Sequence, residues 1–149
     1  MKSRLFVVLL ILMGLLVACN SVNGTQTPIE TAEPKVIPTP ESGRSIIYGK
    51  ALGSNGKPLK DTPVRLAEVY RGEDGSGAFA LDEAFSPATM SDENGEYIFL
   101  NIAPGEYVLF IGSINTEFMI VANPDASAIV YEVAADETLE IDPVTVNFE

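Results

Sequence analysis

Short apolar stretches that alternate with clusters of turn-forming residues place the tightest limit on how this chain can fold. Between residues 44 and 149 these stretches recur about every ten residues, and no long stripe with the period of a helix interrupts them. Gly95 and Gly105 stand where tight turns need a residue without Cβ, and Pro104 presets the turn before Gly105. The pattern predicts an all-β domain, an antiparallel β-sandwich of short strands.

Nine stretches of this region have the composition of strands. We expect strands near residues 45–52, 63–70, 77–81, 88–91, 96–100, 106–111, 117–121, 128–133 and 139–148. Tyr97 and Phe99 alternate with other residues, as do Tyr107 and Leu109, so each pair is expected to face a core. With 106 residues, the region is long enough for one such domain and too short for two.

The first residues have the order of a secretory signal. Lys2 and Arg4 precede an uninterrupted apolar run from Leu5 to Val17. At a helical rise of about 1.5 Å per residue this run covers roughly 20 Å, whereas a hydrocarbon core of about 30 Å needs roughly 20 residues. The run is therefore too short for a permanent span and indicates a signal peptide over residues 1–18.

The four residues Leu16, Val17, Ala18 and Cys19 resemble the lipobox of bacterial lipoproteins. The resemblance implies that the signal peptidase recognises Leu16, Val17 and Ala18, that the thiol of Cys19 accepts a diacylglyceryl group, and that the chain is cleaved before Cys19. Two or three acyl chains, each contributing about 0.8 kcal/mol per buried methylene, would hold the protein firmly on the membrane. Cys19 is the only cysteine, which excludes a disulfide within the chain. An ordinary signal peptide that ends near a cysteine and a plain transmembrane anchor remain the alternatives.

Residues 19–43 have the composition of a tether. After Cys19 this segment contains four prolines and four threonines, and its few large apolar residues follow no regular pattern. As a flexible coil it would span roughly 25–30 Å and lift the domain off the membrane. The alternative is that it folds against the domain. The chain is thus expected to comprise a signal peptide, a lipidated tether and one domain over residues 44–149.

The charge and the missing residue types exclude several functions. The precursor has 9 basic and 21 acidic residues, and loss of Lys2 and Arg4 with the signal leaves a net charge of −14. Such a surface repels phosphates, so nucleic acid is not an expected partner. The chain has no histidine and no cysteine besides Cys19, which removes the usual general base, metal ligand and thiol nucleophile. We therefore expect no enzymatic activity and no cofactor, although carboxylate pairs remain formally possible.

Three sequence segments, in this order, resemble the carboxypeptidase regulatory-like (transthyretin-like, prealbumin-like) domain family. Residues 48–66 are similar to the opening hairpin of that family, residues 89–99 carry the turn Asp92-Glu93-Asn94-Gly95, and residues 101–109 are similar to its Pro-Gly-x-Tyr hairpin. The resemblance implies a single seven-stranded Greek-key β-sandwich and, for most members, a binding or accessory module. The hydroxyisourate hydrolases and intradiol dioxygenases of similar fold depend on histidines, which this chain lacks.

Two candidate sites follow from the residues. Asp92, Asn94 and Glu96 place oxygen-bearing side chains at alternate positions, which is a weak calcium pattern; a hairpin turn with Gly95 in a left-handed conformation explains the same residues.

The second candidate lies in residues 71–87, a connection longer than a hairpin needs, which carries Phe79, Leu81 and Phe85. Val108 and Phe110 are expected on the outer face of their strand. Either the three connection residues fold back as an extra strand and cover that face, or all five form a partner surface.

These observations predict a lipid-anchored protein whose domain faces the extracytoplasmic side. We expect a non-enzymatic, surface-exposed β-sandwich that binds an envelope protein or a polysaccharide, or supports a larger assembly. The alternative is a carbohydrate-binding module or an accessory subunit of an extracellular hydrolase, against which the absence of tryptophan counts modestly.

Overall fold

The structure is a computed structural model that describes residues 36–148. The predicted signal peptide, the lipobox residues Leu16, Val17 and Ala18, the lipidation site Cys19 and most of the tether lie outside the described residues and stay predictions. Over residues 36–148 the secondary structure consists of strands and turns, without a helix. That part of the chain accordingly offers no helix with the length and apolar character needed to cross a membrane.

The described residues form nine strands, at the nine positions that the sequence predicts. They are β1 (Ser45–Gly53), β2 (Pro63–Arg71), β3 (Gly77–Ala80), β4 (Ala88–Met90), β5 (Glu96–Ile102), β6 (Gly105–Gly112), β7 (Phe118–Ile120), β8 (Val130–Val133) and β9 (Thr138–Val146). The predicted ends differ from the observed ends by at most two residues, with the differences of two in β5, β8 and β9.

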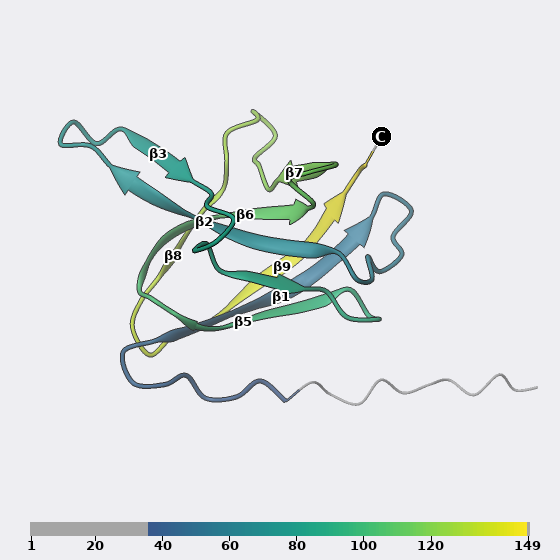
Figure 1. Cartoon of the computed structure of the whole chain (residues 1–149), viewed down its shortest axis with the longest axis horizontal. Helices are drawn as coiled ribbons and strands as arrows, with labels where there is room; N and C mark the ends of the chain where they lie inside the picture. Colours follow the sequence, from purple (N-terminus) through teal and green to yellow (C-terminus); the bar gives the residue numbers. More distant parts are fainter. Residues whose placement is uncertain (1–35, 149) are drawn as a thin grey trace, which may run out of the picture. The chain divides into compact units, whose positions relative to one another are not determined.

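The strands form two sheets that face each other as a sandwich (Figure 1). One sheet has the order β5-β1-β9, and the other has the order β3-β2-β6-β7, with β4 also paired to β2 and β8 also paired to β6. The prediction of an all-β sandwich is confirmed. It was wrong in one respect, because β1 and β9 pair in parallel whereas the other pairs are antiparallel.

The nine strands differ from the seven that the family resemblance implies. β3 and β4 lie along the same edge of β2, separated by a loop, and β7 and β8 lie along the same edge of β6. Each of these edge positions is divided because a loop leaves the sheet and returns to it. The described strands thus fill seven positions, and a Greek-key order remains an expectation.

The connections that resemble hairpins join the two sheets instead. β1 and β2 belong to different sheets, and so do β5 and β6. The alternation of apolar residues determines which face of a strand is buried, but it does not determine which strand pairs with it. The segments 48–66 and 101–109 were therefore predicted as strand–turn–strand correctly and paired wrongly.

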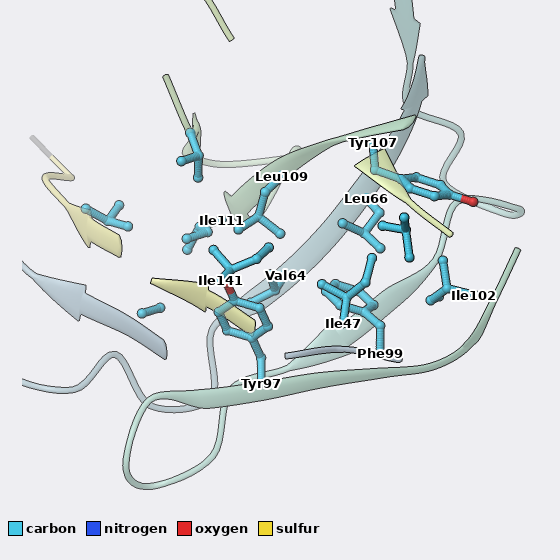
Figure 2. Close-up of a cluster of buried hydrophobic side chains, with 14 residues drawn as sticks. Ile47, Val64, Leu66, Tyr97, Phe99, Ile102, Tyr107, Leu109, Ile111 and Ile141 are labelled. Carbon is cyan, nitrogen blue, oxygen red and sulfur yellow. The ribbon is translucent and has the colours of Figure 1, made fainter. Parts of the chain in front are cut away.

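The main core fills the space between the sheets (Figure 2). Tyr97 and Phe99 are 1% and 3% exposed and enter from the three-stranded sheet, and Leu109 and Ile111 are fully buried and enter from the other. The predicted alternation is thus confirmed on both sheets. Burying an apolar side chain of this size contributes about 1.5–3 kcal/mol, so this cluster dominates the stability of the domain.

The two glycines predicted in tight turns differ in backbone conformation. Gly95 has a φ of 75°, and a Cβ there would meet the carbonyl oxygen of Ala51, so the prediction for this turn is confirmed. Gly105 is not in the left-handed region, and a Cβ there would meet the Tyr107 ring only at an ordinary 3.6 Å. A positive φ of 59° occurs instead at Asn101 inside β5, where the pairing with β1 shifts register, and asparagine tolerates this conformation.

Candidate functional site

A groove of about 540 Å³ lies at the boundary between the three-stranded sheet and the other sheet. Its walls come from residues far apart in the sequence: the residue before β1, the outer half of β2, the β3–β4 loop, the β5–β6 link and the start of β6. The lining residues are Arg44, Glu68, Tyr70, Ala80, Asp82, Phe85, Ser86, Pro87, Asn101, Ile102, Ala103 and Tyr107. A volume of this order is typical of small-molecule sites.

The floor of the groove is apolar and fixed. Ile102 and Tyr107 are 4% and 5% exposed, and the Tyr107 hydroxyl donates a hydrogen bond of 2.8 Å to the carbonyl of Ala103. This bond ties the β5–β6 link to the strand that follows it, much as a tyrosine corner does in other sandwiches. Burial raises the pKa of Tyr107, so its hydroxyl stays protonated and keeps donating at neutral pH.

Two aromatic rings stand in the walls and face solvent. Tyr70 is 56% exposed and Phe85 is 87% exposed. The Tyr70 hydroxyl donates to the Glu68 carboxylate at 3.0 Å, which raises the pKa of Tyr70 and restrains its ring. The groove is therefore bordered by two exposed aromatic rings, whose faces are available for contact.

The turn that carries Phe85 is held by hydrogen bonds at both ends. The amides of Ala84 and Phe85 donate to Asp82 Oδ1 at 2.7 Å and 3.2 Å. The Ser86 amide donates to the Asp82 carbonyl at 3.0 Å, and the Asp82 amide donates to Ser86 Oγ at 2.8 Å. The exposed ring is therefore presented by a pre-formed turn.

Hydrogen-bond donors and acceptors complete the lining. Arg44 supplies a guanidinium that has no carboxylate within ion-pair distance among residues 36–148. Glu68 and Asp82 supply carboxylate oxygens, and Asn101, whose amide nitrogen donates to Glu41 at 3.2 Å, supplies a carbonyl oxygen. The groove thus combines donors, acceptors and apolar rings.

The five residues of the predicted partner surface do not stay together. Val108 is fully buried and Phe110 is 5% exposed, because Leu81 and three other side chains pack against them and the rings of Phe79 and Phe118 lie beside Phe110. The centroids of the Phe79 and Phe110 rings are 5.9 Å apart at an interplanar angle of 70°. Phe79 and Leu81 cover the outer face as the first interpretation expected, which corrects the inclusion of Val108 and Phe110 in an accessible surface, whereas Phe85 points to the groove.

The weak calcium candidate is a turn held by its own backbone. Asp92 Oδ1 accepts hydrogen bonds from the amides of Asn94 and Glu96, each at 2.9 Å, and the Gly95 amide donates to the Asp92 carbonyl at 3.0 Å. Residues 36–148 contain no group of three or more acidic, histidine or cysteine side chains that could hold a metal ion. The turn accounts for Asp92, Asn94 and Glu96, although it joins β4 and β5 of different sheets and does not close a hairpin.

Only one wall of the groove could be predicted from the sequence. Phe85 was singled out because it lies in a long connection, but Arg44, Tyr70, Asn101 and Tyr107 come from four other places. One signal was available: in β2, Tyr70 follows the buried residues of the strand at a position where the sandwich no longer covers it. Arg44 is the first residue of the predicted domain, and the sequence indicates no binding role for it.

Comparisons with known proteins do not assign this chain to a family. No family model matches it, and no curated protein matches it. Among solved structures, a Pseudomonas aeruginosa protein provisionally described as carbohydrate-binding is similar at 15% identity, covering 72% of this chain and 92% of that one, with a TM-score of 0.44.

Two further structures are similar over parts of their length. A DUF3823 family protein from Bacteroides uniformis has 19% identity over 66% of this chain and 41% of its own, with a TM-score of 0.41. The major pilin subunit BcpA of Bacillus cereus has 22% identity over 76% of this chain and 31% of its own, with a TM-score of 0.39. Likenesses this distant indicate neither a ligand nor a role for this chain.

Proposed function

We propose that this chain is a membrane-anchored, surface-exposed lipoprotein without enzymatic activity, whose β-sandwich binds an extracellular partner in the groove. One observation carries the binding role: Tyr70 and Phe85 are held exposed on pre-formed elements around a groove with a fixed apolar floor. The two rings offer apolar surface that a ligand can bury, and a pre-formed site loses little entropy when it binds.

The lack of enzymatic activity is supported by the chemistry of the lining. The chain has no histidine, and the carboxylates of Glu68 and Asp82 already accept hydrogen bonds from Tyr70 and from backbone amides. A general base needs a carboxylate or imidazole directed at the reacting group and a pKa suited to proton transfer. The groove is accordingly suited to holding a partner unchanged.

Attachment to the membrane rests on the lipobox resemblance of Leu16, Val17, Ala18 and Cys19. Metabolic labelling with a fatty acid tests it directly. The wild-type protein should carry label and sediment with membranes, and Cys19→Ser should do neither. Equal labelling of the two proteins would contradict the lipid anchor at Cys19, whereas an ordinary signal peptide would still export the domain.

Crosslinking on intact cells, followed by purification of the full-length protein, tests the binding role. Tyr70→Ala should lose most of the crosslinked partner. Tyr48→Ala is the matched control, because the Tyr48 hydroxyl also donates to a glutamate, Glu140, at 2.8 Å, but lies on the other sheet away from the groove. Equal recovery with the two variants would reject the groove as the binding site.

A further inference from the structure

We infer that the groove takes a neutral oligosaccharide, an inference that rests on the proposed binding role and names the chemical class of its ligand. The choice follows from three properties of the lining residues: flat apolar rings, donors and acceptors side by side, and walls open to solvent. Each property restricts the ligand in a different way, and a chain of uncharged sugars satisfies all three.

The rings set the shape of the ligand. Tyr70 and Phe85 are each more than half exposed, and neither ring is enclosed by a deep apolar pocket. Such a ring offers a flat apolar face beside water and suits a ligand that also has one flat apolar face and polar edges. A pyranose ring has this form, because its C–H groups gather on one face and its hydroxyls project around the rim.

The polar groups set the chemistry of the ligand. The guanidinium of Arg44 can only donate, the carboxylates of Glu68 and Asp82 can only accept, and Asn101 can do both. A hydroxyl is the ligand group that can use donors and acceptors together. An anion would meet the two carboxylates and a cation would meet the guanidinium, so a neutral ligand fits this lining better than either.

The open walls set the length of the ligand. Arg44, Tyr70, Phe85 and Asn101 are all exposed, so nothing closes the groove around a single sugar unit. The volume of about 540 Å³ is larger than one small ring needs, and the ends are in solvent. A chain of several units can therefore lie along the groove and continue beyond it.

A proline-rich peptide is the competing occupant, since aromatic grooves also bind polyproline II segments. Pro38 and Pro40 precede the domain in this chain, but residues 37–40 are absent from the lining of the groove. A sugar differs from such a peptide in offering a hydroxyl, which both donates and accepts, at nearly every position along its chain.

The test uses full-length protein purified in detergent on an array of neutral, acidic and basic glycans, followed by calorimetry with the sugars that bind. We expect neutral oligosaccharides to bind, and to bind more tightly than their monosaccharides. Phe85→Ala and Tyr70→Ala should each weaken binding about tenfold, which corresponds to the loss of one stacking contact of about 1.4 kcal/mol. Arg44→Gln should weaken it as well, and Tyr48→Ala should leave it unchanged.

Several outcomes overturn the inference. Binding confined to acidic glycans, abolished by Arg44→Gln and insensitive to Phe85→Ala, would mean an ion site and not a sugar platform. A proline-rich peptide that binds the groove while every glycan fails would mean the competing occupant. If no glycan binds but crosslinking still depends on Tyr70, the oligosaccharide is wrong and the binding role stands; if Tyr70→Ala changes neither assay, both fail.

Discussion

The hydroxyl of Tyr97 is buried in the core without a hydrogen-bond partner, and removing it should stabilise the protein. Tyr97 is 1% exposed, its ring lies edge-on to Phe99 at 6.0 Å, and its oxygen has no partner within the described residues. The ring crosses Gly49 of the neighbouring strand, where a Cβ would approach the hydroxyl to 2.5 Å. Glycine at position 49 thus makes room for the ring and supplies no partner for its hydroxyl.

The expected gain follows from the cost of burying a hydroxyl without a partner. Mutational data place this cost at about 1–3 kcal/mol. Tyr97→Phe keeps the ring contacts and removes the oxygen, so the free energy of unfolding should rise by about 1 kcal/mol, after allowing for a small cavity. In a domain of this size the thermal midpoint should rise by about 4 °C.

Tyr107→Phe is the matched control, because the Tyr107 hydroxyl does have a partner. It donates to the Ala103 carbonyl at 2.8 Å, so its removal should lower the free energy of unfolding by about 1 kcal/mol. The same substitution is thus expected to have opposite signs at two buried tyrosines. Chemical denaturation followed by circular dichroism measures both, without relying on tyrosine fluorescence.

Alkaline pH supplies a second readout. Burial raises the pKa of Tyr97 far above its ordinary value of 10.0, so the unfolded chain loses this proton first. The stabilisation is complete below about pH 10 and falls above it by about 1.4 kcal/mol per pH unit for one such group. Tyr107 and Tyr131, whose pKa values burial also raises, contribute to the same fall. Tyr97→Phe should therefore flatten the fall without abolishing it, and a variant less stable at pH 7 with an unchanged slope would refute the reasoning.

Further predictions concern the turn, the outer face and the metal. Gly95→Ala should lower the free energy of unfolding by more than about 1 kcal/mol, because of the φ of 75° and the contact with the Ala51 carbonyl; a thermal midpoint within 1–2 °C of wild type would contradict this. Phe110→Ala should cost about 3–5 kcal/mol in denaturant unfolding, whereas Phe85→Ala should change stability by at most about 0.5 kcal/mol, and equal effects would refute the assignment of Phe110 to the covered face. Millimolar calcium should leave the thermal midpoint unmoved, since the oxygen of Asp92 already accepts backbone amides; a rise would restore the calcium site.

The strands could be predicted from the sequence because each depends on residues close together in the chain. Tyr97 and Phe99 alternate on β5 just as Tyr107 and Leu109 alternate on β6, and that alternation alone places them toward a core. Pairing is different, since β1 contacts β9 across almost the whole domain, from Ile46 opposite Thr138 onward. Neither strand's sequence indicates that the other is its pairing partner. The parallel direction follows from how the chain returns to the sheet.

The groove escaped prediction for the same reason. Arg44, Tyr70 and Asn101 are separated by more than twenty residues from one another and are each unremarkable in their local sequence. Asn101 shows the difficulty well: its positive φ lies within β5, at the register shift in the pairing of β5 with β1, and no feature of the local sequence predicts that irregularity. The fold then brings Asn101 into the lining of the groove.

The β3–β4 loop and the strand before it show how one insertion meets two needs. Phe79 and Leu81 pack with Phe110 on the outer face. The hydrogen bonds of Asp82 then reverse the chain and direct Phe85 away from that face and into the groove wall. Because the same turn ends the covered face and begins the groove, Asp82→Ala should reduce groove binding and leave the packing of Phe110 intact. A variant that loses both together would show that the cover and the groove wall fold as one unit.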